Sequence, residues 1–430
     1  MRSGHFSSAE SRMNRRHIRN MLLNSTGEAM WGFQANMVLA STVLTVLLRL
    51  YGAGERTIGA IAGIETAGVL LPQWLGIWVF RSERALKRDF FLWHIFAVCP
   101  FILAMGMTTL FAERMSPAVY RLLMLAWFSG FNFFMGVVVA AWIHWQGRVF
   151  PQQMRGLAVG AAIGASAAAG SCGALAAGAL IARLSAPLSY GVLYITAWLI
   201  SMLSMVFFYL IDDSSDDVSQ PAEPQTISDI LRWFRRSLAD SNFRAYLLGR
   251  VLAGAGFAVL PFIAVHYASP AGGGLTQSMV VSAGSALAVG SAIGGFTLGR
   301  LGDVRGHRLG VMLGVAAQIV ALMGMIFVPG MAGCVVAYFF AGICTMGTWP
   351  CHFNFLIETC PHEGRMAHIA VGNAFIGAAT CLMPVIAGQI AGNLGTTRLF
   401  IISAALSVAA LLWIVGWVEE PRARAVKTGD

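Results

Sequence analysis

Charge is what this sequence lacks most. Only 11% of its 430 residues are Asp, Glu, Lys or Arg, whereas a soluble domain usually carries about 25%. Hydrophobic residues make up 57% of the chain, and its mean hydropathy is +0.69. So little charge excludes an ordinary water-soluble protein, and we predict that most of the chain lies in a membrane.

Several signatures of chemistry are also missing. The seven cysteines form no CxxC pair and no Cys/His cluster at zinc spacing, so we expect buried free thiols. There is no GxxxxGK[ST] loop, which argues against a self-contained ATP-driven pump. No nucleophile elbow, metal triad or paired catalytic carboxylates support an enzyme, and we expect no bound cofactor. Residues 1–20 are polar and basic without a cleavage site, so we expect no cleavable signal peptide.

Long apolar runs dominate what is present. A membrane-spanning helix needs about 20 predominantly apolar residues. We predict twelve spans, at residues 28–50, 57–80, 89–112, 118–144, 156–183, 189–211, 243–268, 276–299, 309–329, 332–357, 366–392 and 397–418.

The basic residues predict how the spans are oriented. With the N-terminal tail inside, the tails and loops of that side hold 22 Lys and Arg, and Arg250 lies within a span. The other side holds six: Arg49, Arg56, Arg114, Arg121, Arg183 and Arg398. Because cytoplasmic loops are enriched in Lys and Arg, we predict a multi-pass protein of the bacterial inner membrane, or a membrane derived from it, with both termini cytoplasmic. The net charge of +9 therefore reflects the basic residues of the cytoplasmic side, and no nucleic-acid partner is expected.

A hydrophilic stretch divides the spans into six and six. It opens with acidic and turn-forming residues and continues as an amphipathic segment, Ile227 to Leu238, with Arg232, Arg235 and Arg236. Such a segment is expected to lie along the inner leaflet. The predicted organisation is an N-terminal tail (1–27), a six-helix bundle (28–211), a cytoplasmic linker (212–242), a second six-helix bundle (243–418) and a C-terminal tail (419–430).

An internal repeat supports this division. Pro151 and Arg155 follow span 4, and Pro361 and Arg365 follow span 10, at an offset of 210 residues. Gly27-Glu28 of span 1 is echoed by Gly249-Arg250 of span 7. Parallel repeats of this kind occur in one large class of transporters.

One loop motif carries a resemblance. Between spans 8 and 9 the chain reads GRLGDVRGHR, which resembles the cytoplasmic signature Gly-x-x-x-Asp-Arg-x-Gly-Arg-Arg of the major facilitator superfamily. The residues concerned are Gly299, Asp303, Arg305, Gly306 and Arg308. In that family the loop latches one conformation; the alternative is that its arginines are simple inside-positive anchors. The loop between spans 2 and 3 departs from the pattern, and Glu83 is its candidate acidic residue.

The resemblance implies a fold and a function. The fold class is an all-α polytopic membrane protein with twelve transmembrane helices in two six-helix bundles. The implied function is that of a secondary transporter, or permease, moving a small solute by rocker-switch alternating access, with proton coupling as an option. The chain looks closest to a poorly characterised bacterial branch. Its expected partners are a small-molecule or ion substrate and the lipid bilayer, and we expect a monomer.

Two alternatives stay open. One is a metal or iron permease of a specialised, magnetosome-like bacterial membrane. The chain has 21 methionines and nine histidines, but no pair at ligand spacing, and adjacent Cys351 and His352 point about 100° apart on a helix. A metal site is therefore unassigned. The other is a non-transporting sensor or assembly factor, which could have lost the latch of its N-terminal half.

Polar residues within spans are the candidate working groups, because they are costly in lipid. Glu65 and Glu28 are candidates for proton or cation coupling, and Glu28 is also a candidate gate partner of Arg250 in the outward-open state. The alternatives are hydrogen-bonded or snorkelling side chains. In the resembled family spans 1, 4, 7 and 10 line the central cavity, which makes its candidates Gln34, Asn36, Asn132, His144, Thr348, His352 and Asn354. For His352 a packing role is equally open. His94, beside Trp93, is interpreted as an interfacial residue.

Overall fold

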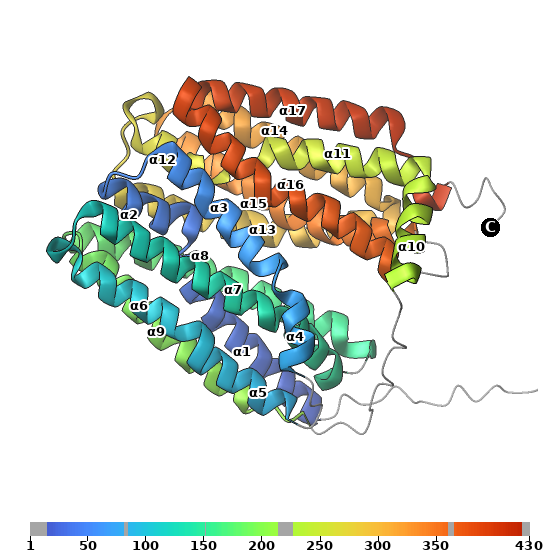
Figure 1. Ribbon diagram of the computed structural model, residues 1–430, viewed down its shortest axis with the longest axis horizontal. Helices are drawn as coiled ribbons and strands as arrows, with labels where there is room; N and C mark the ends of the chain where they lie inside the picture. The colour runs from blue at the N-terminus through green and yellow to red at the C-terminus, as the bar shows by residue number, and fades with distance from the viewer. Residues whose placement is uncertain (1–14, 81–84, 151, 214–226, 360–364, 424–430) are drawn as a thin grey trace, which may run out of the picture.

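The computed structural model describes residues 15–80, 85–150, 152–213, 227–359 and 365–423. These residues form helices and connecting turns, with no β-strand among them. The helices gather into two groups that follow each other along the chain (Figure 1). Glu83, Pro151 and Pro361 lie outside the described residues, so the loop candidate and the Pro-x3-Arg repeat stay predictions.

The N-terminal group contains the elements from residue 15 to residue 209. They are α1 (Arg15–Met37), the π-helix η1 (Ala40–Leu44), α2 (Thr45–Leu50), α3 (Glu55–Leu70), α4 (Gln73–Val79), α5 (Leu86–Trp93), the π-helix η2 (His94–Val98), α6 (Cys99–Leu110), the 3-10 helix η3 (Ala112–Arg114), α7 (Pro117–Val149), α8 (Gln152–Arg183) and α9 (Leu188–Tyr209).

The C-terminal group follows the connecting helix α10 (Ile227–Ala239). It contains α11 (Ser241–Phe257), α12 (Leu260–Ala268), the 3-10 helix η4 (Pro270–Gly272), α13 (Gln277–Arg305), α14 (His307–Phe327), α15 (Gly330–Glu358), α16 (Arg365–Leu394) and α17 (Thr396–Trp417).

Eleven helical segments of the described chain are long and apolar enough to cross a membrane. The remaining predicted span, 57–80, is present as α3 and α4, which are interrupted at Leu71 and Pro72. Proline has no N–H to donate and clashes with the preceding turn, so it breaks the hydrogen-bond ladder there. The predicted all-α membrane fold with about twelve crossings in two bundles is confirmed.

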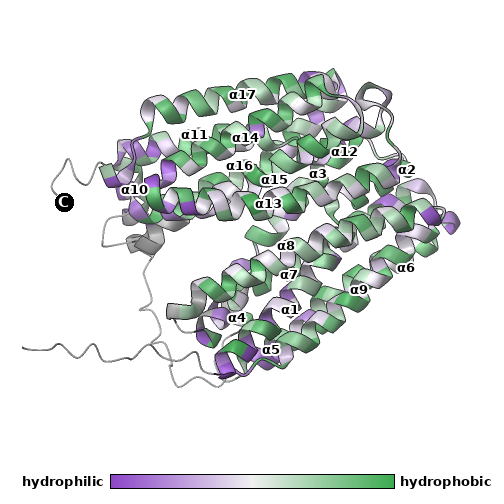
Figure 2. Cartoon of the chain, turned by 180° about the vertical axis from the view of Figure 1, so that it is seen from behind, coloured by the Kyte–Doolittle hydropathy of each residue, from purple (hydrophilic) through white to green (hydrophobic). Residues whose placement is uncertain are grey.

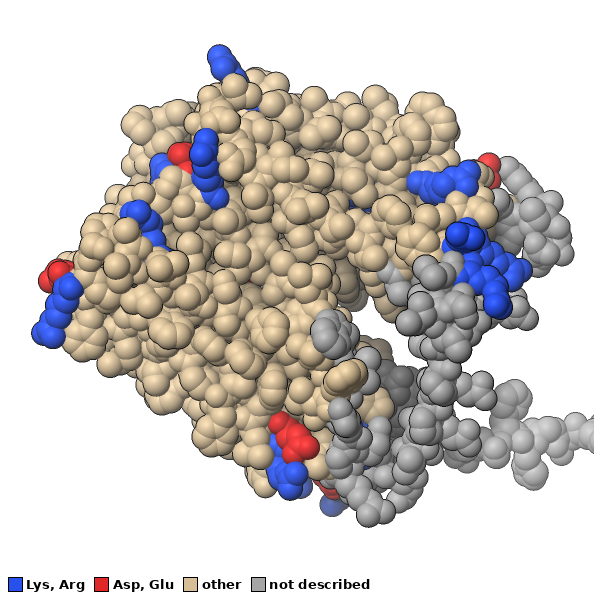
Figure 3. Space-filling view, in the orientation of Figure 1, with Lys and Arg blue, Asp and Glu red and all other residues tan. Residues whose placement is uncertain are grey.

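The outer surface of the helices is apolar. Leu122, Phe296 and Phe327 are each about 70% exposed, and Figure 2 shows hydrophobic colour along the helices with hydrophilic residues mainly near their ends. Figure 3 shows the same for charge, since Lys, Arg, Asp and Glu lie towards the rim of the visible face. Large apolar surfaces mark a membrane or partner contact, and lipid is the solvent that matches this distribution.

The first helix starts earlier than predicted. We placed residues 15–27 in the tail because they are polar, but they form the first turns of α1. Asn20 is buried, donates to the carbonyl of Asp212 at 2.7 Å and accepts from the Asp212 N–H at 3.0 Å. Arg16 forms an ion pair with the Asp212 carboxylate at 3.3 Å. Arg16 and Asn20 of this segment therefore contact other protein groups, and Glu28 lies thirteen residues, or about 20 Å, into the helix.

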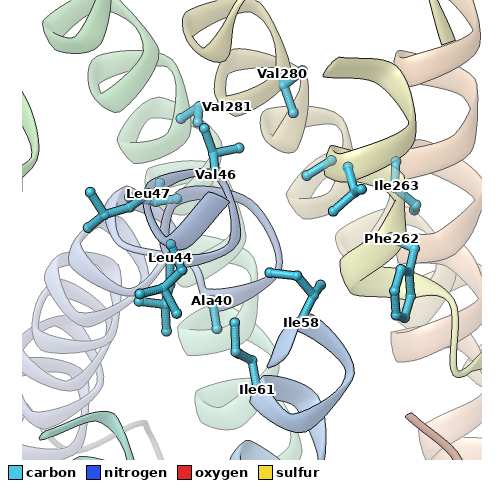
Figure 4. Close-up of a cluster of buried hydrophobic side chains, with 14 of the residues drawn as sticks. Ala40, Leu44, Val46, Leu47, Ile58, Ile61, Phe262, Ile263, Val280 and Val281 are labelled. Atoms are coloured by element: carbon cyan, nitrogen blue, oxygen red, sulfur yellow. The ribbon is translucent and has the colours of Figure 1, made fainter. Parts of the chain in front are cut away.

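The two groups share a hydrophobic core at one end only. A single cluster of buried residues joins η1, α2 and α3 to α12 and α13; Ile58, Ile61, Phe262 and Val281 belong to it (Figure 4). Towards the other end, the N-terminal group has its own cluster around Phe90, and the C-terminal group has a separate one. The groups are therefore joined at the end of α2 and α12 and apart at the end of α4, α5 and α10, as Figure 1 shows.

Small residues allow close contact at the joined end. α3 packs on α16, and α8 packs on α13. A Cβ atom added to Gly59 would lie 2.3 Å from the carbonyl oxygen of Pro384 and 2.9 Å from the Cα of Gly388. Two polar contacts add to this packing: Tyr190 Oη donates to Gln277 Oε1 at 2.9 Å, and Arg56 donates to Asn393 Oδ1 at 3.3 Å.

The predicted amphipathic segment is helical. α10 packs on α11 and α16. A hydrogen bond of 2.9 Å joins Ser237 Oγ to Nδ1 of His368 on α16. Arg232, Arg235 and Arg236 lie on the exposed side of α10.

Candidate functional site

A cavity of about 390 Å³ lies between the two helix groups. Small-molecule sites usually measure about 300–1,000 Å³. The N-terminal group contributes α1, α7 and α8, and the C-terminal group contributes α13 and α15. The lining residues are Asn24, Glu28, Asn36, Trp142, Gln146, Val159, Ala162, Ile163, Ser166, Ala167, Leu287, Ala288, Ser291, Ala292 and Met346. Both groups therefore form one site, on the side of the molecule where they lie apart.

Two amides organise one wall of this cavity. Gln146, near the C-terminal end of α7, donates from Nε2 to Oδ1 of Asn24 on α1 at 2.6 Å, and both side chains are buried. This bond leaves the carbonyl oxygen Gln146 Oε1 buried without a hydrogen-bond partner among the described residues. An unsatisfied buried acceptor is costly, so Gln146 Oε1 is available to accept a hydrogen bond from a solute or a water molecule.

Glu28 is the only ionisable residue among the described ones that line the cavity. It lies one helical turn after Asn24 on α1, so both side chains face the same way. No Lys, Arg or His is among the described lining residues. An ionised Glu28 carboxylate would be stabilised by the amide dipoles and by a bound solute, because the described wall carries no cationic side chain. The site is therefore suited to a positively charged or neutral solute and unsuited to an anion.

A second, smaller cavity of about 150 Å³ lies inside the N-terminal group. Glu28 and Trp142 line both cavities, so these two side chains form the partition between them. The other residues that line it are Trp31, Phe90, His94, Met135, Val138, Val139, Met205 and Phe208. Glu28 and His94 are thus the two titratable groups of its described lining.

His94 was interpreted from the sequence as interfacial, and this was wrong. The structure buries it inside the N-terminal group, with 4% of its surface exposed. Its Nδ1 is 2.9 Å from the carbonyl oxygen of Phe90, and its ring packs against Phe90 at 4.2 Å and edge-on to Trp31 at 5.9 Å. The position of His94 near the end of an apolar run could not predict its burial, because the residues that bury it come from other helices, α1 and α7.

Of the seven predicted cavity residues, Asn36 lines the large cavity. It donates to the Gly32 carbonyl at 3.0 Å. Gln34 is buried but lines neither cavity, and Asn132 is satisfied by the Phe128 carbonyl at 2.8 Å. His144 is exposed, although it lies between the wall residues Trp142 and Gln146 in the sequence of α7.

The candidates on α15 have partners within the C-terminal group. Thr348 donates to the Cys344 carbonyl at 2.7 Å. His352 is bonded through Nδ1 to Tyr246 Oη at 2.7 Å and lies 3.4 Å from Asn373 Oδ1. Asn354 is half-buried and lines neither cavity. In this conformation Thr348 and His352 bond to groups of their own helix bundle, and a role in solute binding stays a prediction.

Glu28 and Arg250 do not form an ion pair here. Glu28 lines the cavities of the N-terminal side, whereas Arg250 lies on α11 with its Nε buried and without a partner among the described residues. The predicted pairing concerns the outward-open state and stays a prediction. Glu65 is half-buried on α3 and lines neither cavity, so its coupling role also stays a prediction.

The motif between α13 and α14 is held by the end of the chain. Gly306 has a φ of +99°, and a Cβ there would lie 2.4 Å from the carboxylate of Glu420. Glu420 Oε2 accepts the backbone N–H of Arg308 at 2.9 Å, and the Arg308 guanidinium donates to the carbonyls of Ile414 and Val415. A glycine is required at this turn both for its conformation and for the approach of Glu420.

The acidic residue of the motif lies in the same cluster. Arg422 donates to the Asp303 carbonyl and to Glu358 Oε1, both at 2.6 Å. Buried His307 lies 3.4 Å from Glu358 and 3.8 Å from the Asp303 carboxylate. Gly299 faces Pro350, and Arg305 is exposed. These contacts all lie within the C-terminal group, so a latch between the two groups remains a prediction for another conformation.

Sequence reasoning missed Asn24, Gln146 and Trp142. Asn24 lies in the predicted tail, Gln146 lies beyond the predicted end of span 4, and Trp142 lies inside that span two residues before its end. The spacing of Asn24 and Glu28 was the one available signal, because residues four apart share a helix face. No group of three or more His, Cys, Asp or Glu suited to a metal occurs in the described part of the chain, so the geometry does not favour the metal alternative.

Comparison with known proteins is consistent with this architecture. The family model of the Major Facilitator Superfamily matches residues 246–430. No curated protein matches the chain by sequence.

Several solved structures share its fold. The xylose transporter XylE from E. coli, in an inward-open conformation, is 16% identical with a TM-score of 0.67, over 94% of this chain and 97% of that one. The nucleoside transporter NupG is 12% identical with a TM-score of 0.64, over 94% and 99%. A bacterial homologue of the human lysosomal transporter Spinster, inward-facing and unoccupied, is 14% identical with a TM-score of 0.64, over 94% and 95%. Such low identities establish the fold alone. The family model thus matches the C-terminal part of the chain, and the fold of these transporters extends over nearly its whole length.

Proposed function

We propose that this protein is a secondary transporter that moves a small organic cation by rocker-switch alternating access. The observation that carries the proposal is the cavity built by both helix groups, with Glu28 as the single ionisable residue of its described wall. Because the groups share a core at one end and not at the other, the cavity faces the side of α4, α5 and α10. Rocking about the site would expose it to the opposite side.

The walls favour a cation with an apolar body. Trp142 offers an aromatic face, and aromatic rings attract cations by about 0.5–2 kcal/mol depending on desolvation. Glu28 supplies the opposite charge, and Gln146 Oε1 supplies a free acceptor. The remainder of the wall is largely Ala, Val, Ile, Leu and Met, which suits an apolar portion of the solute.

A neutral hydroxylated solute is the second candidate. The Asn24–Gln146 amide pair, Ser166 and Ser291 provide donors and acceptors without charge. Two fold neighbours, XylE and NupG, carry a sugar and nucleosides by their names. A metal ion is a poorer fit, since one carboxylate is the only charged ligand on the described wall.

The test is binding and exchange of matched probes by the reconstituted full-length protein. Benzyltrimethylammonium, D-xylose and benzenesulfonate represent a cation, a neutral solute and an anion. We expect exchange of labelled benzyltrimethylammonium across proteoliposomes, no exchange of benzenesulfonate, and at least a tenfold loss of cation exchange in Glu28→Gln. Glu113→Gln, at an exposed turn, is the matched control.

Two results would overturn the cation proposal. Exchange of D-xylose alone would favour the neutral solute. Exchange of benzenesulfonate would contradict the inference that the cavity is unsuited to an anion. Binding of the cation without exchange would favour the non-transporting alternative.

A further inference from the structure

The cavity inside the N-terminal group has no place in the transport path described so far. It is lined by α1, α5, η2, α7 and α9, and apart from Glu28 and His94 its described lining is Trp, Phe, Met and Val. Among the described residues, neither α7 nor α9 contributes a titratable group to it. Two ionisable residues inside a membrane bundle are expected to interact with each other or to take part in function, because each raises the free energy of membrane insertion.

We propose that the Glu28 carboxyl group has two positions, one for each protonation state, and that His94 receives it in the protonated one. This inference rests on the proposed transport function and adds to it the place where the coupling proton is held. In one position the carboxylic acid turns into the small cavity and donates its O–H to Nε2 of His94. In the other the carboxylate turns to the large cavity, towards Asn24, Gln146 and the solute.

His94 is prepared as an acceptor by its own backbone contact. Its Nδ1 lies 2.9 Å from the Phe90 carbonyl oxygen, which can only accept, so Nδ1 carries the proton of the neutral ring. Nε2 is then left with a lone pair. Phe90 and Trp31 hold the ring plane by aromatic contacts. The ring therefore presents a strong acceptor in a cavity whose other described lining side chains, Glu28 apart, offer only the weak thioether acceptors of Met135 and Met205.

The two cavities differ in the charge they tolerate. The small one is apolar, and an ionised carboxylate entering it would lose its hydration without gaining a cation, whereas the neutral acid needs only one acceptor. The large one provides the amides of Asn24 and Gln146 beside Glu28. Protonation would thus select the position, and rotation about side-chain bonds between staggered rotamers is enough for the change.

The step balances. A cation enters the large cavity, the Glu28 acid turns from His94 into that cavity and releases its O–H proton to water there, and the resulting carboxylate faces the cation. One positive charge replaces another, so the net charge of the site does not change. His94 stays neutral throughout and acts as a positioning residue.

Infrared spectroscopy tests the proposal without any substrate. The reconstituted full-length protein is compared at low and high pH, and the C=O stretch of a protonated carboxyl that disappears in Glu28→Gln is assigned to Glu28. In His94→Phe, which keeps a ring but has no acceptor, this band should shift to the frequency of an acid without that hydrogen bond. In His94→Gln, whose amide oxygen accepts, it should return towards the wild-type frequency. His266→Phe, at a buried histidine of the other group, is the control and should leave the band in place.

An unshifted band in His94→Phe would overturn the proposal, and so would a wild-type protein that shows no band sensitive to Glu28→Gln. A variant that is misfolded is recognised by loss of the remaining carboxyl bands, and His94→Gln then decides: a frequency as far from wild type as that of His94→Phe counts against the acceptor role.

Transport gives a second readout. His94→Phe should lose at least tenfold in accumulation of benzyltrimethylammonium driven by a pH gradient, while exchange of the same probe at equal pH stays within about twofold of wild type. His94→Gln should retain both. Equal gradient-driven accumulation by wild type and His94→Phe would contradict the coupling role. If wild type exchanges no probe, the proposed transport function fails, and the infrared result alone decides the two positions of Glu28.

Discussion

At the scale of single residues, the cavity wall depends on buried polar side chains that form hydrogen bonds with other groups of the protein. Asn24 and Gln146 come from helices 122 positions apart and bond to each other in a buried setting. Asn20 does the same with the backbone of Asp212. These pairs explain why a polar first segment is part of the bundle, since each amide would be costly if it were alone in an apolar environment.

Replacing one amide of the cavity pair should destabilise the protein. Gln146→Leu leaves Asn24 Oδ1 without its donor, and we expect the free energy of unfolding to fall by about 1–3 kcal/mol. Reversible unfolding in mixed detergent micelles measures this. The double variant Asn24→Leu, Gln146→Leu should recover part of the loss, because both partners are then apolar. Additive losses would show that the two amides do not depend on each other.

At the scale of elements, glycines set how closely helices of the two groups approach. Gly59 on α3 meets the backbone of α16 at Pro384 and Gly388. Gly178 on α8 meets α13, where an added Cβ would lie 1.9 Å from the Ser282 hydroxyl. Backbone contact of this kind has little tolerance for a side chain, and small residues are the usual means of close packing in lipid.

A large residue at Gly59 should keep the joined end from closing. In Gly59→Leu the side chain would occupy the place of the Pro384 carbonyl, so the population should move towards the conformation that is open at that end. Spin labels at Arg114 and Ala271, on turns of the two groups at this end, should show a longer mean distance than in the wild type. Gly416→Leu is the matched control, because an added Cβ at Gly416 meets nothing within 4 Å. The same distance in Gly59→Leu and wild type would contradict the role of this contact.

At the scale of the whole molecule, two bundles share a core at one end and enclose a cavity towards the other. The side on which they lie apart carries α4, α5 and α10 (Figure 1). The distribution of Lys and Arg predicts that this side is cytoplasmic, and in that orientation the structure is an inward-open state.

Fusion proteins test this orientation. Green fluorescent protein joined to the C-terminus should fluoresce, and alkaline phosphatase joined there should be inactive, because the first matures in the cytoplasm and the second outside it. Alkaline phosphatase joined after Arg114, in a turn predicted to face outwards, should be active. The reverse pattern would invert the membrane orientation and make the described state outward-open.

The sequence by itself predicted a lipid environment, the membrane-spanning helices and the resemblance to the major facilitator superfamily. Low charge, long apolar runs, the Lys and Arg distribution and the motif around Asp303 are local properties, and local properties survive in a single sequence. It also drew attention to Glu28, because a carboxylate in an apolar run is conspicuous without any neighbour.

Only the tertiary structure decided what surrounds that carboxylate. Gln146 reaches Asn24 from another helix, Trp142 and Glu28 separate two cavities, and His94 turns inward behind Phe90. Conversely, Asn132, Thr348 and His352 stood out in the sequence but are bonded to nearby protein groups. The reason is geometric: a cavity is formed by helices distant in the chain, and a helix's own pattern does not show which neighbour each face will meet.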